Sequence, residues 1–260
     1  MSWQKQTLTK PLFPDILWNR PINKRTAGNI LIIGGHGNQF SHTQNVYTAA
    51  LSAGAGSVTV ALPKSVQKLI GNLPDCEFLP ANPSGSLAKE GLEELLELSN
   101  GVDATVLAGE LSNNTETVGM LSRFMQDHKQ TLVVCEEVIN TFHKTPDVLP
   151  IEGMYVMSVA TAASLAQSLK IPIDIKTANP QKTARLLQEL SLQLPDVMFA
   201  LYDGEHIFVQ AQDHMSATPQ NGADSSRIAG YMSTFMLQHS NKFEALTTGA
   251  YVASGGETDI

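Results

Sequence analysis

The chain has 260 residues, of which 42% are hydrophobic and 16% charged, so it can bury a large core and is too apolar to be disordered. Its net charge of −8, without a basic cluster larger than Lys24-Arg25, argues against a nucleic-acid partner, which requires many cations. No leader-like segment and no apolar run of about 18 residues is visible, so we expect a cytoplasmic protein without membrane contact. Cys76 and Cys135 have no metal-ligand spacing, so we predict no metal site built by the protein.

The stretch from Gly28 to Pro63 predicts a βαβ unit, in which a buried strand at Ile30 to Ile33, a glycine turn and a helix lead to a second strand at Val58 to Ala61. Strands that are continuously apolar are typical of a parallel sheet covered by helices on both faces. The Gly34-Gly35 pair leaves the backbone open at a strand end, where α/β proteins bind their ligands. Phe40 stands where a dinucleotide fingerprint would have its third glycine, and no Walker A lysine follows.

The chain as a whole predicts an α/β fold with a mainly parallel, doubly wound sheet, because strands alternate with helices at regular spacing. We predict one domain over residues 1–260, in which prolines make residues 1–28 an irregular arm. The Asp203-Gly204 pair predicts a hairpin and hence antiparallel strands. The further predicted elements are a helix at 64–71, a connection at 74–83, a helix capped by Ser86, strands at 103–108 and 131–135 around a helix at 115–127, a strand at 154–157, helices reaching 169 and at 179–194, strands within 197–210, a loop at 211–220, and helices after 224 and at 243–253.

Asp224 opens a helix that follows the loop Asn221-Gly222-Ala223. The first amides of a helix lack partners within it, so this end is a candidate site for phosphate. Asp is also among the commonest N-cap residues, and capping alone explains its presence. From the residues alone, the cap is the favoured interpretation.

The opening stretch, GNILIIGGHG followed by SAGAGSVTVALP, resembles the start of the ADP/ATP-dependent NAD(P)H-hydrate dehydratases, which repair hydrated nicotinamide cofactors. The likeness extends from about Asn23 to Ala253 and is most specific in the first third. It implies a ribokinase-like fold with helices on both faces of the sheet. It also implies ATP or ADP as cofactor, with Mg²⁺ as a candidate companion, and substrates like NADHX and NADPHX. In such enzymes the hydroxyl of the hydrate is phosphorylated and phosphate is then eliminated.

The same resemblance implies site residues in this chain. The family's Gly-Thr-Gly-Asp phosphate loop falls on residues 221–224, which makes Asp224 the implied catalytic residue. The implied nucleotide- and phosphate-binding residues are Asn221, Gly222, Ala223, Ser225, Tyr202 and Asp203. The implied substrate-binding residues are Gly35, His36, His42, Glu110, Glu137 and Ser158. Homo-oligomerisation is left open.

Several positions depart from the family pattern. Its Gly-Pro-Gly-Leu-Gly turn falls on residues 108–112, where Glu110 adds a negative charge that should repel a phosphate-bearing ligand. Its Thr-Pro-His-x-Gly-Glu segment falls on residues 156–161, where both the His and the Glu are lost. We therefore expect weak or absent dehydratase activity. The alternatives are a non-catalytic homologue that binds a nucleotide or a protein partner, and a ribokinase-like small-molecule kinase.

Four further side chains have two interpretations each. His36 and His42 follow the first strand and either titrate near a ligand or serve as polar loop residues. The pair Glu136-Glu137 follows another strand and either holds a hydrated cation or is a solvated charge pair. The sequence leaves both questions open.

Overall fold

The computed structural model describes residues 3–257 except 20, 22, 38 and 173–178. Its strands form one ten-stranded sheet in the order β1-β10-β9-β8-β7-β6-β5-β2-β3-β4. The seven strands from β8 to β4 in this order are parallel, whereas β9 runs antiparallel to both of its neighbours. The strands are β1 (Gln4–Lys5), β2 (Asn29–Gly34), β3 (Ser57–Pro63), β4 (Cys76–Leu79), β5 (Ala104–Gly109), β6 (Thr131–Cys135), β7 (Glu152–Ser158), β8 (Asp196–Tyr202), β9 (His206–Ala211) and β10 (His214–Pro219).

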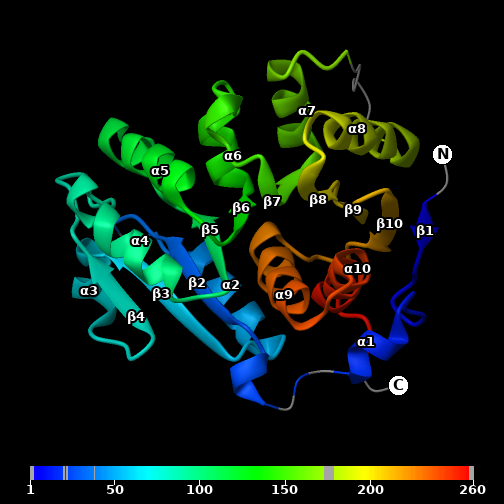
Figure 1. Ribbon diagram of the computed structural model, residues 1–260, viewed down its shortest axis with the longest axis horizontal. Helices are drawn as coiled ribbons and strands as arrows, with labels where there is room; N and C mark the ends of the chain where they lie inside the picture. The colour runs from blue at the N-terminus through cyan, green and yellow to red at the C-terminus, as the bar shows by residue number, and fades with distance from the viewer. Residues whose placement is uncertain (1–2, 20, 22, 38, 173–178, 258–260) are drawn as a thin grey trace.

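Helices cover both faces of the sheet (Figure 1). One face carries α4 (Leu92–Asn100), α5 (Thr115–Asp127), α6 (Glu136–Phe142), α7 (Val159–Ser168) and α8 (Pro180–Gln193). The other carries α2 (Ser41–Ser52), α9 (Ser225–Gln238) and α10 (Lys242–Ala253). The remaining helices are α1 (Pro14–Trp18), α3 (Lys64–Ile70) and the 3₁₀ turns η1 (Lys24–Thr26), η2 (Lys89–Gly91) and η3 (Pro146–Val148). Within the described ranges, no helix has the length and apolar character needed to span a membrane.

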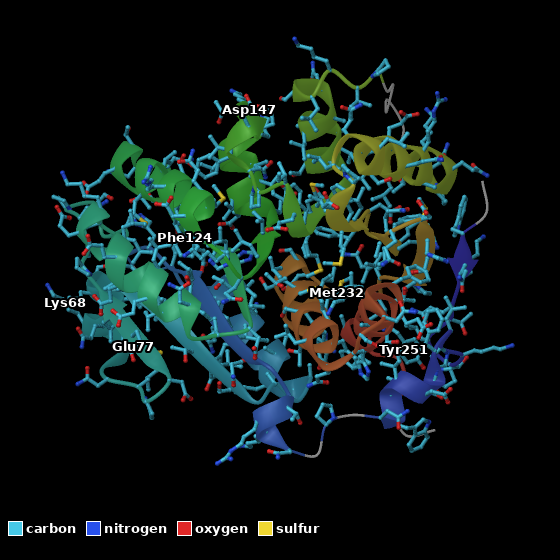
Figure 2. All side chains as sticks on the ribbon, in the orientation of Figure 1. Lys68, Glu77, Phe124, Asp147, Met232 and Tyr251 are labelled. Atoms are coloured by element: carbon cyan, nitrogen blue, oxygen red, sulfur yellow. The ribbon has the colours of Figure 1, made fainter. Side chains whose placement is uncertain are left out.

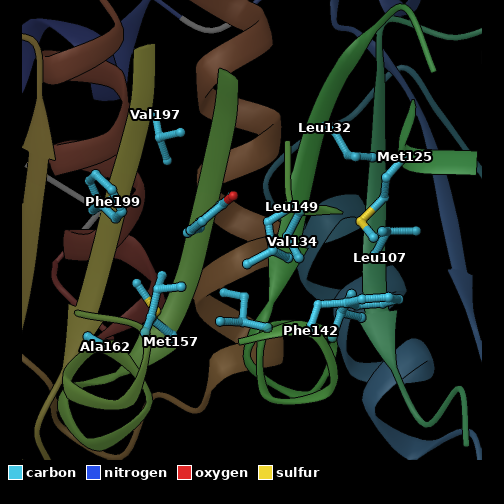
Figure 3. Close-up of a cluster of buried hydrophobic side chains, with 14 of the residues drawn as sticks. Leu107, Met125, Leu132, Val134, Phe142, Leu149, Met157, Ala162, Val197 and Phe199 are labelled. Atoms are coloured by element: carbon cyan, nitrogen blue, oxygen red, sulfur yellow. The ribbon is translucent and has the colours of Figure 1, made fainter. Parts of the chain in front are cut away.

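The two faces of the sheet are both apolar because side chains alternate along each strand. In β2, Leu31 and Ile33 belong to the core under α4 to α8, while Ile30 and Ile32 belong to the core under α2, α9 and α10. Figure 3 shows the first core as a row of side chains from successive strands, including Leu107, Val134, Met157 and Phe199. Figure 2 shows Phe124 on α5 and Met232 on α9, which belong to the two different cores. Burial of each large side chain contributes about 1.5–3 kcal/mol.

The predicted α/β architecture is confirmed, and the predicted strands at 30–33, 58–61, 103–108 and 131–135 lie centrally in the sheet. Two strands beyond the N-terminal arm were missed. The predicted connection at 74–83 contains β4, and the predicted loop at 211–220 contains β10. Both are polar or short, and their pairing with β3 and β9 decides their conformation rather than an apolar pattern.

Other local predictions also need correction. Ser86 does not cap a helix, because its amide donates to Asn82 Oδ1 and α4 begins only at Leu92. The short helix α6 directly after β6 was not predicted. The arm of residues 1–28 is not wholly irregular, since it holds β1, α1 and η1, and β1 pairs with β10 at the sheet edge.

Candidate functional site

The carboxyl ends of β5, β6, β7 and β8 lie side by side at one edge of the sheet, where ligands bind in open α/β proteins. Two cavities of about 500 Å³ lie at this edge, beside a smaller one of about 290 Å³ that includes Ser41 and Glu110 in its lining. The first encloses about 510 Å³ and is lined by residues after β2, β5 and β6. The second encloses about 500 Å³ and is lined by residues at the ends of β7 and β8. Neither described lining includes a Lys or an Arg.

The first cavity brings together four of the expected substrate-binding residues, His36, His42, Glu110 and Glu137. A fifth, Gly35, is buried behind them, and its amide donates to the Gly109 carbonyl at 3.3 Å. Polar side chains outnumber apolar ones among the described residues that line this cavity. The lining comprises His36, Gln39, His42, Gly109, Glu110, Leu111, Ser112, Asn113, Leu121, Glu137, Val138, Asn140, Thr141 and Phe142.

Glu110 points from the end of β5 to the start of α2. Its carboxylate accepts hydrogen bonds from the Ser41 amide at 3.1 Å, the Ser41 hydroxyl at 2.9 Å and the His42 amide at 3.1 Å. The Glu110 amide in turn donates to Glu137 Oε2. The backbone of Glu110 has a φ of 56°, and that of Ser112 has a φ of 65°, a region that favours glycine. The turn therefore keeps a glycine-like path while it carries side chains.

His42 connects the first cavity to the start of α9. Its Nε2 lies 3.5 Å from Glu137 Oε1, and its Nδ1 lies 2.9 Å from the Ser226 hydroxyl. His36 is held separately, with its Nδ1 2.8 Å from the Ser86 hydroxyl. Both histidines are therefore fixed by neighbours at the cavity wall rather than loose in the loop.

The carboxylate of Glu136 holds two residues of the second cavity's lining, Ser158 and Tyr202. This carboxylate accepts hydrogen bonds from the hydroxyls of Ser158, Thr161 and Tyr202. Burial raises the pKa of Glu136, but these hydrogen bonds outweigh burial and lower the pKa from its ordinary value. Burial, together with the hydrogen bond to Glu136, raises the pKa of Tyr202. Glu136 is therefore held as the anion and Tyr202 as the neutral phenol.

The structure distributes the remaining expected residues unevenly. Ser158, expected on the substrate side, lines the second cavity beside Tyr202 and Asp203. Glu136 and Glu137 bind different partners and do not converge on one point, so the geometry does not favour the shared cation site. In the described part of the chain, no group of three or more His, Cys, Asp or Glu side chains could hold a metal ion.

The start of α9 adjoins one lining residue of each cavity, since Ser226 contacts His42 and Ser225 lies beside Tyr202. Asp224 is its N-cap, and Asp224 Oδ1 accepts the Arg227 amide at 2.8 Å, as the capping interpretation requires. The amides of Ser225 and Ser226 have no acceptor among the described protein atoms. Gly222 has a φ of 76°, and an added Cβ would meet nothing within 4 Å. Two free amides thus stand beside an open backbone turn, an arrangement that suits a phosphate group.

The residues of the loop before α9 differ in their exposure. Asn221, which has a φ of 40°, turns its side chain to donate to the Ser254 carbonyl at 3.0 Å. Ala223 is buried, and its amide donates to the Gln220 carbonyl. Gly222 and Asp224 are therefore exposed, whereas Ala223 and Ser225 are buried and the Asn221 side chain is turned toward Ser254.

No protein-family model matches the chain. It is 28% identical over 180 residues to the bifunctional NAD(P)H-hydrate repair enzyme Nnr of Moorella thermoacetica, a match that covers 64% of this chain and 34% of the relative. The chain thus spans about a third of the length of this curated relative. The resemblance to the NAD(P)H-hydrate dehydratases found in the sequence is confirmed.

Two solved structures carry the comparison of folds. A ribokinase-like superfamily protein of Enterococcus faecalis superposes with a TM-score of 0.75 at 16% identity, over 98% of this chain and 88% of the other. The ADP/ATP-dependent NAD(P)H-hydrate dehydratase of Bacillus subtilis, co-crystallised with ATP and Mg²⁺, superposes with a TM-score of 0.65 at 13% identity, over 94% and 87%. The fold is ribokinase-like.

Within this ribokinase-like fold, three residues that sequence reasoning missed hold the site together. Gln220 is buried, accepts the Gly204 amide at 2.6 Å and donates to the Ala223 carbonyl at 2.7 Å, which ties the β8–β9 turn to the α9 loop. Thr161 completes the hydroxyls around Glu136, and Ser226 contacts His42. Ser226 alone had a signal in the sequence, its place in the first turn of a predicted helix.

Proposed function

We propose that the protein binds ATP or ADP together with a hydrated nicotinamide nucleotide across these two cavities, in the manner of an NAD(P)H-hydrate dehydratase. The observation that carries the proposal is the start of α9, where two free amides belong to residues that adjoin the linings of both cavities. Ser226 contacts His42 of the first cavity, and Ser225 lies close enough to Tyr202 of the second to influence its pKa. A cytoplasmic location and homo-oligomerisation belong to the same proposal.

The residues at this point fit a phosphate-bearing ligand through the backbone rather than through cations. The Ser225 and Ser226 amides offer donors, and Gly222 leaves room for close approach. Because the described cavity linings lack Lys and Arg, we propose that Mg²⁺ accompanies the nucleotide. A bound nucleotide would supply the phosphoryl group that converts the hydroxyl of the hydrate into a leaving group.

We assign to Asp224 the role of accepting the proton from that hydroxyl. Its Oδ1 caps α9 through the Arg227 amide, and its other oxygen has no protein partner among the described residues. A carboxylate in this position can accept a proton while the cap stays intact. The loop amides would hold the transferring group, and the first cavity would hold the nicotinamide part of the substrate.

The same geometry favours slow chemistry. A phosphoryl transition state depends on positive charge or donors placed around it, and the first cavity supplies two carboxylates, Glu110 and Glu137, instead. We therefore propose that dehydratase activity is weak or absent. This observation also favours the second candidate, a non-catalytic protein that binds the nucleotide.

The test is a comparison of wild type with Asp224→Asn. Asn caps a helix as well as Asp does, so the variant should keep its stability while it loses the proton acceptor. If the protein is active, turnover of hydrated NADH or NADPH with ATP or ADP should fall about 10²- to 10⁴-fold, with little change in binding.

Ligand-induced shifts in melting temperature supply the matching measurement of binding. Shifts with ATP, ADP or NADPH but no turnover by wild type would support the non-catalytic candidate. A fast wild-type rate that Asp224→Asn leaves unchanged would contradict the role of Asp224. The absence of both shifts and turnover would contradict the proposed function.

A further inference from the structure

The start of α2 is a helix end that already holds an anion. The helix has 12 residues, and its N-cap residue, Phe40, provides no side-chain hydrogen bond. Glu110, 69 residues away in the chain, replaces the missing cap. Its Oε1 accepts both the amide and the hydroxyl of Ser41, and its Oε2 accepts the His42 amide. Both oxygens of one carboxylate are thus occupied by donors that would also suit a phosphate.

The backbone at Glu110 points to a reason for this side chain. Its φ of 56° lies in the left-handed region, where a side chain is disfavoured and glycine is preferred. The Glu110 amide also donates to Glu137, so the peptide is held in place from both sides. Residues held in a disfavoured backbone conformation are typical of functional sites, and Glu110 is such a residue at a cavity wall.

We propose that the Glu110 carboxylate is a built-in anion that fills the α2 end of the first cavity and excludes phosphate from it. Glu110 thereby determines specificity: the cavity accepts an uncharged or cationic part of a ligand against its wall. Glu137 adds a second negative charge close by, and the described lining contains no Lys or Arg to offset it. The inference goes beyond the proposed function, because it concerns α2 and does not depend on nucleotide binding at α9.

The experiment removes the carboxylate and adds inorganic phosphate. The Glu110→Gly variant suits the backbone and leaves the α2 donors free. Backbone amide resonances of Ser41 and His42 are followed by NMR during titration with phosphate. We expect saturable shifts of both resonances in Glu110→Gly, and at least about tenfold weaker binding at these amides in wild type, which corresponds to about 1.4 kcal/mol.

Glu94→Gln is the matched control for charge. Glu94 is exposed in the first turn of α4, so this variant changes the net charge by the same amount away from the cavity. It should behave as wild type at Ser41 and His42. If Glu110→Gly does not fold, Glu110→Gln replaces it, since the amide nitrogen of Gln cannot accept the His42 amide as Oε2 does.

The outcomes separate this inference from the proposed function. Equal phosphate binding by wild type and Glu110→Gly at Ser41 and His42 would overturn it, and so would no binding there in either Glu110 variant. A response of Glu94→Gln equal to that of Glu110→Gly would show an effect of net charge alone and would also overturn it. Shifts confined to the Ser225 and Ser226 amides would contradict the inference about α2 while leaving the function proposed for α9 in place.

Discussion

Two helices, α2 and α9, direct their amino-terminal ends at the same edge of the sheet and differ in how these ends are satisfied. The α2 end has no cap of its own and is filled by Glu110, which follows the neighbouring strand β5. The α9 end is capped by its own Asp224, which uses only the Arg227 amide. The next amides of α9, those of Ser225 and Ser226, have no protein acceptor among the described residues. A local cap thus leaves a helix end open, whereas a distant carboxylate closes it.

Because one helix end is open and the other is filled, we expect the two ends to bind different parts of a ligand. We expect phosphate at the open end of α9, and an uncharged ligand group in the cavity that borders the filled end of α2. The His42 side chain spans the two, with Glu137 on one side and Ser226 on the other. The predictions below test whether the open and the filled end are as distinct as the geometry indicates.

The largest effect is expected at the open end, for Gly222→Val. A β-branched side chain at a φ of 76° is strained and would cover the amides that face the opening. We expect the nucleotide-induced shift in melting temperature to disappear. Gly71→Val is the matched control, because Gly71 has a φ of 71° and equally open surroundings and lines neither cavity. A nucleotide shift that survives in Gly222→Val would place nucleotide binding elsewhere.

The next largest effect is expected where α2 and α9 pack against each other. A Cβ added at Gly230 of α9 would lie 2.6 Å from the Ala49 Cβ and 2.6 Å from the Val46 carbonyl. Gly230→Ala should therefore lower the free energy of unfolding by about 1–3 kcal/mol, measured by urea denaturation. Gly119→Ala in α5 meets nothing within 4 Å and should instead stabilise by about 1 kcal/mol. Equal effects of the two substitutions would show that the helix contact is not tight.

The parts of the fold that could be predicted are those whose signal is local. Strands β2, β3, β5 and β6 are apolar because they are buried on both faces, and the sequence carries that pattern directly. Strand β10, with residues His214–Pro219, is mostly polar. Its buried Ser216 is hydrogen-bonded to Thr247, and its buried Thr218 accepts a hydrogen bond from Gln6. Such a strand exists because its neighbours pair with it, which a single stretch of sequence does not reveal.

The site follows the same rule. The Asp224 cap and the Gly222 turn were predictable, because both depend on residues close in sequence. Asp224 caps the amide of Arg227, and Gly222 turns the chain through its own backbone. The contact of Glu110 with Ser41 joins residues 69 positions apart, and that of Tyr202 with Glu136 joins residues 66 apart. The charge at Glu110 was visible in the sequence, but its direction toward α2 depends on the order of strands in the sheet.

A smaller effect is expected from acid, through Glu136 behind the open end. The folded pKa of Glu136 is lowered, so its carboxylate stabilises the fold above its ordinary pKa, and this contribution is lost as the pH falls through the folded pKa. Urea unfolding from neutral pH downward should show a loss of stability below about pH 4.5 that is smaller in Glu136→Gln than in wild type. Glu94→Gln should follow wild type. Parallel curves for wild type and Glu136→Gln would contradict the lowered pKa.

The smallest effect is expected for the link between the two ends, the pair His42 and Glu137. Their closest atoms are 3.5 Å apart, and the side chains are 37% and 45% exposed, so solvent screens their attraction. A double-mutant cycle with His42→Gln and Glu137→Gln should give a coupling energy of about 0–1 kcal/mol that falls with added salt. Each single substitution should cost more than the coupling, because His42 also contacts Ser226 and Glu137 also accepts the Glu110 amide. A coupling above about 2 kcal/mol would mean that His42 and Glu137 join the filled and the open end into one unit, and the two ends would then have to be treated as a single site.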